Sequence, residues 1–538
     1  MKMLTETLKN KSTQQLSGAE IVVNTLVNNG IDTIFGYPGS PILPLYNALS
    51  KNGKIKHYLA RHEQGAVHAA EGYARIKGKC GVVLVTSGPG ITNTITGILN
   101  SHADRTPLVV LCAQSENSEK NEFQDVDITK VLTGYTKRSY FIKTQEDLLK
   151  TLSNAIRDAN NVPQGPVVVA FTKSVLENET PVSEYKQRKE IKVEAPQSCV
   201  LRTLDKLKNA ARPLIIVGGG CSGAEREVRE FIKLTHIPVV NTLMATGVVD
   251  DLSSGLIGYN GDTELNNRIN DSDVVLALGC RFSDRTTCYM ESFLPTSKII
   301  NINIEQNSSK NVVMDEEILG ELNIVVQQMT GTILSRNIVF NTHYEWIDKL
   351  CSETFDNTSD NDSMTAKNVI KEIYEYTKKY NPILTTDVGN HQITAAKVFK
   401  TNSSGHFITS GGFGTMGYGL PAAIGACIAK PDSTVLNITG DGSFQMNMQE
   451  LGMCAEYNLP VKIFIMNNSA LGMIKSQQKE HNYNEYQSDI LNPNFVEIAS
   501  AYGILGRRIS SISELRQALK EIFTYKKAVV LDIKVESN

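Results

Sequence analysis

The sequence predicts an α/β protein built from three successive doubly wound domains with mainly parallel sheets. The main observation is that short β-branched runs alternate with longer helix-like segments along the whole chain. Near-continuous apolar strands separated by helices are typical of parallel sheets that helices cover on both faces. The chain has 538 residues, and at roughly 100–200 residues per domain this length suits three or four such units. A hydrophobic content of 41% supplies enough apolar material for several cores.

The apolar runs fall into three groups along the chain. The expected strands are, in order, Gly81–Thr86, Pro107–Ala113, Gly165–Phe171, Pro213–Gly218, Ser272–Gly279, Lys298–Ile304, Pro382–Asp387, Ser433–Asp441, Pro460–Asn468 and Ala528–Val535. Two polar stretches, Asn178 to Gln197 and Cys351 to Met364, indicate linkers, because prolines punctuate the first and Asp, Asn, Ser and Thr fill the second. We therefore expect domains at residues 1–185, 195–345 and 360–538.

Composition and charge exclude several classes of function. Lys and Arg number 54 against 57 Asp and Glu, a net charge of −3, which lacks the basic excess of a nucleic-acid binder. The apolar runs are far shorter than the ~20 residues of a bilayer helix, and the polar stretch Met1 to Ser17 does not resemble a secretory signal. The nine cysteines contain no C-x-x-C pair, which favours buried thiols over a disulfide framework or a zinc site. We expect a cytoplasmic protein without a nucleic-acid or membrane partner.

The most specific motif lies in the last third of the chain. One expected strand ends at Gly440-Asp441-Gly442, and 24 residues later the next strand ends at Asn467-Asn468. The intervening Ser443–Tyr457 is helix-like, so both strand ends meet at one edge of the sheet. There Asp441 and Asn468 offer oxygens to Mg²⁺, while the glycines and the following helix amides suit a diphosphate. Each half alone is also a common turn; the pair at this spacing is specific and is similar to the thiamine diphosphate motif.

Further blocks resemble the acetohydroxyacid synthase (acetolactate synthase) family of thiamine carboligases from about Gly18 to the C-terminus. They are GYPGSPILPLYNAL (Gly36–Leu49), HEQGAVHAAEGYAR (His62–Arg75), VVLVTSGPG (Val82–Gly90), SGGFGTMGYGLPAAIGA (Ser410–Ala426) and GDGSFQMNMQEL (Gly440–Leu451). The resemblance implies a pyrimidine-binding first domain, a central FAD-binding or dinucleotide-like domain, and a third domain that binds diphosphate and Mg²⁺.

The resemblance also implies site residues, position by position. Glu63, just before the helix-like Ala66–Lys77, matches the glutamate that hydrogen-bonds the aminopyrimidine ring and drives its imino form. Gln124, with Phe123 beside it, matches a pair near the active site, and Lys173 matches a lysine at the channel mouth. The implied metal ligands are Asp441, Asn468 and the carbonyl of Ala470. The implied thiamine diphosphate contacts are Gly389, Asn390, His391, Gly414, Met416, Gly442, Ser443, Gly472 and Met473, of which Met416 bends the cofactor and, with Met473, also belongs to the catalytic set.

The middle domain carries a weaker signal. The glycine turn Val217–Gly220 lies between an expected strand and the helix-like Ala224–Leu234, as in dinucleotide sites, although such a turn is also common for structural reasons. The resemblance implies that this domain holds FAD without net redox. The matching positions are Gly218, Gly219, Thr242, Leu243, Gly258, Gly279, Arg281 and Glu321. The chain departs from the family here, with Asn303 for an acidic residue and Glu321 for Asp, and in the first domain, where Pro163 precedes the Gly165–Phe171 strand in place of a common Arg.

The positions that match the family's acceptor-binding residues depart most from the family pattern. Arg285 matches the arginine that binds the acceptor's carboxylate, for which a guanidinium fork is suited. Gln477 stands where the biosynthetic enzymes carry Trp, whose apolar face distinguishes acceptor oxoacids. Ser40-Pro41 is a further change, whereas Asn390, in the diphosphate-binding turn, is a mild change from the family's usual Gln. The donor and cofactor residues match the family, and the acceptor side is remodelled.

The resemblance implies a transferase that decarboxylates pyruvate and joins the two-carbon unit to a 2-oxoacid, giving acetolactate or another acetohydroxyacid for branched-chain amino acid biosynthesis. Alternatives keep the donor and use a keto-sugar or another ketone as acceptor, or stop at simple decarboxylation or oxidation of the 2-oxoacid. A catalytically inactive paralogue serving as a binding or regulatory subunit is disfavoured by the intact Glu63, Asp441 and Asn468. The implied assembly is a homodimer or homotetramer, with a possible small regulatory subunit.

Overall fold

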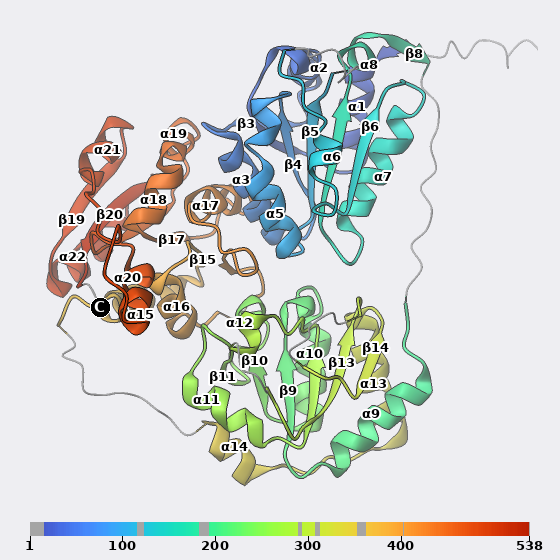
Figure 1. Ribbon diagram of the computed structural model, residues 1–538, viewed down its shortest axis with the longest axis vertical. Coiled ribbons are helices and arrows are strands. Elements are labelled where there is room, and N and C mark those ends of the chain that lie inside the picture. The colour runs from blue at the N-terminus through green and yellow to red at the C-terminus, as the bar shows by residue number, and fades with distance from the viewer. Residues whose placement is uncertain are drawn as a thin grey trace, which may run out of the picture. The chain divides into compact units, whose positions relative to one another are not determined.

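The structure is a computed structural model that describes residues 15–115, 123–181, 193–288, 293–306, 312–351, 362–401 and 403–536. Its strands form three six-stranded sheets and one two-stranded sheet (Figure 1). The chain divides into two compact units, Met1–Lys189 and Glu190–Asn538. The first holds one of the large sheets, and the second holds the other two. The expected linkers lie partly outside the described residues, at 182–192 and 352–361, as does the stretch 1–14.

The first large sheet is parallel, with the strand order β3-β2-β4-β5-β7-β6. Its strands are β2 (Thr33–Gly36), β3 (Lys56–Leu59), β4 (Gly81–Val85), β5 (Leu108–Ala113), β6 (Arg138–Ile142) and β7 (Pro166–Phe171). The helices α1 (Gly18–Asn28), α2 (Leu43–Asn52) and α7 (Leu148–Asn160) share one apolar cluster with the sheet. The helices α3 (Glu63–Lys77) and α5 (Ile95–Ala103) pack against each other, and α3 also packs on β2 and β4. The β-branched strands are buried throughout, as two-sided cover requires.

The middle sheet is also parallel, with the order β11-β10-β9-β12-β13-β14. Its strands are β9 (Pro213–Val217), β10 (Val239–Asn241), β11 (Ser253–Leu256), β12 (Val274–Leu278), β13 (Lys298–Asn303) and β14 (Glu316–Leu319). The helices α9 (Gln197–Asn209), α10 (Glu225–Thr235) and α13 (Leu322–Arg336) share one apolar cluster with it. A second cluster contains residues of α11 (Thr263–Arg268) and α14 (Tyr344–Cys351). Alternate residues of β9 and β12 belong to the two clusters, so both faces of this sheet are covered.

The third sheet has the order β16-β15-β17-β18-β20-β19, again parallel. Its strands are β15 (Ile383–Thr386), β16 (Phe407–Ile408), β17 (Val435–Gly440), β18 (Lys462–Asn467), β19 (Leu505–Ile509) and β20 (Val529–Lys534). The helices α15 (Ala366–Thr377), α16 (Asn390–Val398) and α22 (Ile512–Ile522) share one apolar cluster with it. The helix α17 (Gly419–Ala429) packs on β15 and β17, and α21 (Phe495–Ala501) packs on β19 and β20. Because β17 and β18 are direct neighbours, the expected meeting of their carboxyl ends is confirmed.

The ten expected strands are all present, and the fold class is confirmed. Two expectations were wrong in detail. Ser443–Tyr457 is not one helix: α18 (Asp441–Asn447), a 3₁₀ turn (Met448–Glu450) and α19 (Leu451–Glu456) follow one another. The break falls at Asn447, which leaves helical geometry and donates its side-chain amide to the carbonyl of Gly417 at 2.8 Å. The first expected linker contains β8 (Glu179–Pro181), which pairs with β1 (Gln15–Ser17). The domain boundaries themselves stay predictions.

Candidate active site

Three turns meet at the carboxyl edge of the third sheet. Gly389 follows β15 and precedes α16, Asp441 follows β17 and begins α18, and residues 468–471 join β18 to α20 (Gly472–Glu480). Since these strands are parallel, all three turns lie at the same edge, where open α/β sheets bind ligands. The helix after β17 begins at Asp441, two residues earlier than the sequence suggested, because Gly440 is its N-cap.

Asp441 is a buried carboxylate, 2% exposed. Its Oδ1 accepts a hydrogen bond from the backbone N–H of Gly442 at 2.9 Å, and its Oδ2 accepts from the N–H of Ser469 and the side-chain amide of Asn492, both at 2.7 Å. Burial raises the pKa of the Asp441 carboxyl above its usual value, although these hydrogen bonds oppose the shift. A divalent cation beside the carboxylate would favour its charged form. The environment therefore suits a metal ligand.

The turn after β18 brings further oxygens to this edge. Asn468 accepts a hydrogen bond from the N–H of Ala470 through Oδ1, at 3.2 Å. A Cβ added at Gly472 would lie 2.8 Å from Nδ2 of Asn468 and 3.5 Å from Nδ2 of Asn390, so the absence of a side chain there lets the two amides approach. Within the described residues, no three His, Cys, Asp or Glu side chains form a metal cluster. A cation here would therefore take one carboxylate with amide and backbone oxygens, the donor set of Mg²⁺.

His391 lies against the Asp441 turn. A Cβ added at Gly440 or at Gly389 would come within 3.0 Å of Cε1 of His391, and Gly389 also has a φ of +148°. The ring is 7% exposed, and its Nε2 has no hydrogen-bond partner among the described residues. Burial lowers the pKa of His391 to about 4. A buried polar atom without a partner is costly. A phosphate oxygen would partner Nε2 once that nitrogen is protonated, and an anion beside the ring favours the protonated form.

The remaining expected cofactor contacts surround the same turns. A Cβ added at Gly442 would lie 2.9 Å from Cδ2 of Leu471 and 3.7 Å from Cε of Met416, so Met416 lies beside the start of α18. Ser443 donates its hydroxyl to the carbonyl of Val388 at 3.4 Å. Gly414 has a φ of +75°.

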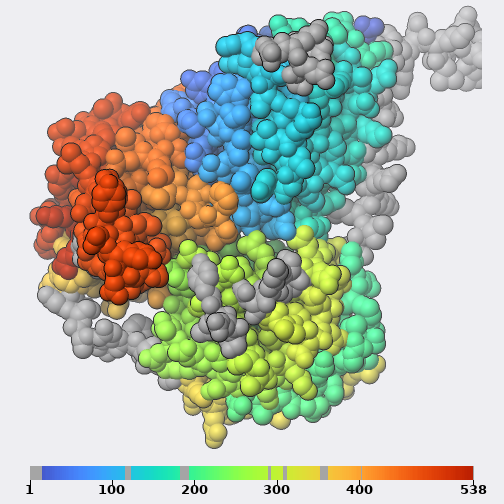
Figure 2. Space-filling model, in the orientation of Figure 1, coloured from blue at the N-terminus to red at the C-terminus, as the bar shows by residue number. Residues whose placement is uncertain are grey.

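The helix α20 carries Met473 and Gln477, both half-buried. None of the residues of α20 is fully buried, and the helix lies on the surface of the C-terminal part in Figure 2.

Glu63 lies at the carboxyl edge of the first sheet. It is the first residue of α3, and the helix begins three residues earlier than expected because the side chain of His62 caps it by accepting from the N–H of Gln64 at 3.1 Å. Oε2 of Glu63 accepts from the side-chain amide of Asn93 at 3.0 Å, and Oε1 lies 3.6 Å from where a Cβ of Gly90 would be. The carboxylate is thus fixed on one side and lies near a glycine turn on the other.

Gln124 borders the same turn. Gly88 has a φ of +58°, and a Cβ there would lie 2.6 Å from that of Gln124. Lys173 follows β7 at this edge and forms an exposed ion pair with Glu177 at 3.5 Å, while Phe123 is 93% exposed. Glu63, Gln124 and Lys173 thus share the carboxyl edge of the first unit.

The expected FAD residues follow the strands of the middle sheet. They lie after β9 (Gly218, Gly219), β10 (Thr242, Leu243), β11 (Gly258), β12 (Gly279, Arg281) and β14 (Glu321). Backbone packing explains some of these glycines without a ligand, since a Cβ at Gly218 would lie 2.4 Å from the carbonyl oxygen of Gly279. Asn303 donates to the carbonyl of Cys280 at 3.0 Å. The guanidinium of Arg285 lies 4.2 Å from the ring centroid of Tyr259.

Sequence reasoning missed two contacting amides. Asn93 fixes Glu63, and Asn492 fixes Asp441. Asn93 lies three residues after the quoted run Val82–Gly90, and its proximity to Glu63 depends on the fold. Asn492 lies 51 positions after Asp441, with no motif around it, so only the structure reveals it.

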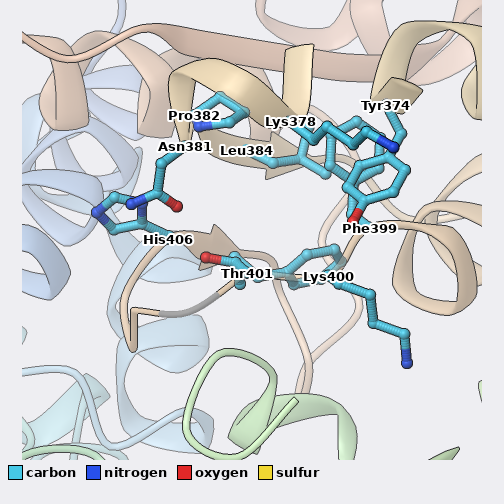
Figure 3. Close-up of a pocket in the computed structure, with 10 residues that line it drawn as sticks. Tyr374, Lys378, Asn381, Pro382, Leu384, Phe399, Lys400, Thr401 and His406 are labelled. Atoms are coloured by element: carbon cyan, nitrogen blue, oxygen red, sulfur yellow. The ribbon is translucent and has the colours of Figure 1, made fainter. Parts of the chain in front are cut away.

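A cavity of about 300 Å³ lies at the other end of β15 (Figure 3). Asn381 and Pro382 precede β15, and His406 precedes β16, so these lining residues mark the amino edge of the sheet. Lys378 is paired with Glu375, and the ammonium of Lys400 points away from the cavity in Figure 3. The cavity is therefore separate from the cofactor turns.

Family models agree with this arrangement. Residues 16–131 match the N-terminal TPP binding domain of thiamine pyrophosphate enzymes, residues 200–329 match their central domain, and residues 387–533 match their C-terminal TPP binding domain. Fold and site thus define a thiamine pyrophosphate enzyme. No helix in the described part of the chain has the length and apolar character needed to cross a membrane.

Individual relatives identify the family more closely. The chain is 38% identical to the acetolactate synthase large subunit of Haemophilus influenzae, covering 98% of this chain and 95% of the relative. It is 36% identical to the acetolactate synthase isozyme 3 large subunit of Escherichia coli, with 98% and 96% covered. It is 35% identical to the probable acetolactate synthase large subunit of Methanococcus aeolicus, with 97% and 92% covered. The chain belongs to the acetolactate synthase large subunit family.

Proposed function

We propose that this protein is an acetolactate synthase: it decarboxylates pyruvate and transfers the two-carbon unit to a second 2-oxoacid. The observation that carries the proposal is the similarity over nearly the whole chain to relatives named acetolactate synthase large subunit. Thiamine diphosphate, when bound, supplies the electron sink for the decarboxylation. The protein supplies orientation, fixed charges and exclusion of water.

Residues of the third sheet hold the diphosphate and the metal in this proposal. Asp441, Asn468 and the carbonyl of Ala470 bind Mg²⁺. The role of Asp441 is supported by its burial, which raises the pKa of its carboxyl and which a bound cation would offset. His391 and the first amides of α16 and α18 bind the diphosphate, as helix N-termini do. The partnerless Nε2 of His391 supports this assignment. Met416, beside Gly442, would contact and position the cofactor.

Glu63 moves a proton at the aminopyrimidine ring. Its contact with Asn93 leaves Oε1 on the side of the Gly88–Gly90 turn, where a ring can approach the carboxylate. Proton transfer by one positioned side chain is typically worth ~10²–10⁴-fold in rate. Gln124 and Lys173 lie at the same edge, and we assign them to the part of the active site around the Glu63 carboxylate.

FAD in the middle domain is also proposed, without net redox. The expected contacts follow five of the six strands at one sheet edge, the place where such folds bind dinucleotides. The relatives' names contain "large subunit", which supports a small regulatory subunit as partner. We further propose a homodimer or homotetramer and domains at 1–185, 195–345 and 360–538.

The acceptor is tested through Gln477, a half-buried residue of α20, which the family resemblance matches to a Trp. Without that apolar surface, we expect little preference for 2-oxobutyrate over pyruvate as acceptor. One methylene in an apolar pocket is worth about 10–200-fold in selectivity, so Gln477→Trp should raise the preference within that range. The measurement is the ratio of acetohydroxybutyrate to acetolactate formed at a fixed substrate ratio.

Two outcomes contradict parts of this proposal. Strong preference of the unaltered protein for 2-oxobutyrate would assign acceptor selection to another residue. Decarboxylation of pyruvate with neither product would favour the alternative, in which a keto-sugar or another ketone is the acceptor. Lys479→Trp, an exposed position on the same helix, is the matched control and should leave the ratio unchanged.

A further inference from the structure

Asn492 occupies a position that no motif marks. It lies in the loop before α21, half-buried, and its side-chain amide contacts three residues of the candidate metal region. Its Nδ2 donates to Oδ2 of Asp441 at 2.7 Å and to Oδ1 of Asn467 at 2.9 Å. Its Oδ1 accepts from the side-chain amide of Gln445 at 2.9 Å. Both donors and one acceptor site of this amide are therefore in use.

The neighbours of Asn492 fix which way its amide faces. Asn467 accepts from Asn492 because its own Nδ2 is already committed to Oδ1 of Asp532, at 2.7 Å. Asp532 is 1% exposed and also accepts from the guanidinium of Arg508, at 3.1 Å. A reversed amide at Asn492 would place its oxygen against the Asp441 carboxylate. The hydrogen-bond network thus holds Nδ2 toward Asp441.

The hydrogen bond from Asn492 limits how many acceptor sites the Asp441 carboxylate has left for a cation. An ionised carboxylate has about four lone-pair sites, two on each oxygen. Oδ2 accepts from the N–H of Ser469 and from Asn492, which fills both of its sites, and Oδ1 accepts from the N–H of Gly442. The backbone N–H of Asp441 is a further donor to the carboxylate. Oδ2 carries two of the three hydrogen bonds from other residues, which leaves Oδ1 as the less occupied oxygen.

We propose that Asn492 is a positioning residue that makes Asp441 a ligand through a single oxygen, and so favours Mg²⁺ over Ca²⁺. This inference rests on the proposed role of Asp441 as a metal ligand. Mg²⁺ takes six oxygens in strict octahedral geometry, whereas Ca²⁺ accepts six to eight and commonly takes both oxygens of a carboxylate. Occupying Oδ2 with two N–H donors denies a larger cation its second oxygen.

The test measures metal binding directly. Mg²⁺ and Ca²⁺ affinities are measured by calorimetry on the full-length protein with thiamine diphosphate at saturation, for the unaltered chain, Asn492→Ala and Asn492→Leu. Outer-shell partners of metal ligands are typically worth 10–100-fold in affinity, so both variants should lose Mg²⁺ affinity in that range. The ratio of the Mg²⁺ to the Ca²⁺ affinity should fall with it. Asn492→Leu keeps the branching of the side-chain heavy atoms, which separates loss of the amide from loss of the side chain as a whole.

Asn484→Ala is the matched control, because Asn484 lies in the same loop before α21 and is exposed. It should keep both affinities. If the Asn492 variants behave like this control while Asp441→Ala loses Mg²⁺, the positioning role is wrong and the metal site stands. If Asp441→Ala itself keeps the Mg²⁺ affinity, the proposed metal site is wrong, and the role of Asn492 with it.

Discussion

Replacing Glu63 by Gln should slow exchange of the C2 proton of bound thiamine diphosphate by ~10²–10⁴-fold, the usual contribution of a positioned acid–base group. The substitution keeps the shape of the side chain and one oxygen that can accept from Asn93. It removes the ionisable carboxylate, so the pyrimidine ring loses the group that moves its proton. Cofactor affinity should change little, because the diphosphate and metal contacts assigned above involve other residues. Proton exchange followed by NMR in deuterated solvent measures the effect.

Glu179→Gln provides the control for this variant. Glu179 lies in β8 of the same unit and is exposed, so the same chemical change should leave the exchange rate as it was. An unaltered exchange rate in Glu63→Gln with cofactor bound would remove Glu63 from the proposed mechanism.

Replacing Asp441 by Ala should cost the protein more Mg²⁺ affinity than the roughly 10–100-fold expected for loss of an outer-shell partner. The variant loses the only carboxylate assigned to the metal, and the diphosphate loses the cation that would neutralise it. It also removes the carboxylate that accepts from Gly442, Ser469 and Asn492. Calorimetric titration with Mg²⁺ and with thiamine diphosphate should therefore show both affinities falling together.

Asp432→Ala is the matched control for Asp441→Ala. Asp432 is exposed and precedes β17, whereas Asp441 follows the same strand. Its loss should leave both affinities intact. Unchanged affinities in Asp441→Ala would mean that Gly440-Asp441-Gly442 serves only as a turn.

The core strands could be predicted because they are long, β-branched and buried on both faces. β5 and β7, for example, contain buried residues only, so their apolar runs are nearly continuous. The short or polar strands could not be predicted from the sequence. β16 has two residues, and β14 is largely charged, so neither forms an apolar run that periodicity can detect. The break between α18 and α19 depends on the contact of Asn447 with Gly417, which a helical pattern does not contain.

The site residues that could be predicted are those that lie close together in the chain or at the ends of neighbouring strands. The pairing of β17 with β18 explains why Asp441 and Asn468 meet, and that pairing follows from the strand–helix–strand order. Asn93 and Asn492 reach Glu63 and Asp441 from loops 30 and 51 positions away, so no local pattern indicates them. The glycine turn of the middle domain shows the opposite case, since the contact between Gly218 and Gly279 accounts for a glycine that also suits a dinucleotide. The remaining role assignments follow from family resemblance.

We infer that this chain joins a two-carbon unit from pyruvate to a second carbonyl compound. The most direct measurement is incubation of the purified protein with ¹³C-labelled pyruvate, thiamine diphosphate and Mg²⁺, with the products identified by NMR. The expected result is acetolactate carrying label from two pyruvate molecules, formed only when thiamine diphosphate is present. Label that ends solely in acetaldehyde or acetate, or pyruvate that stays unconsumed under these conditions, would contradict the account.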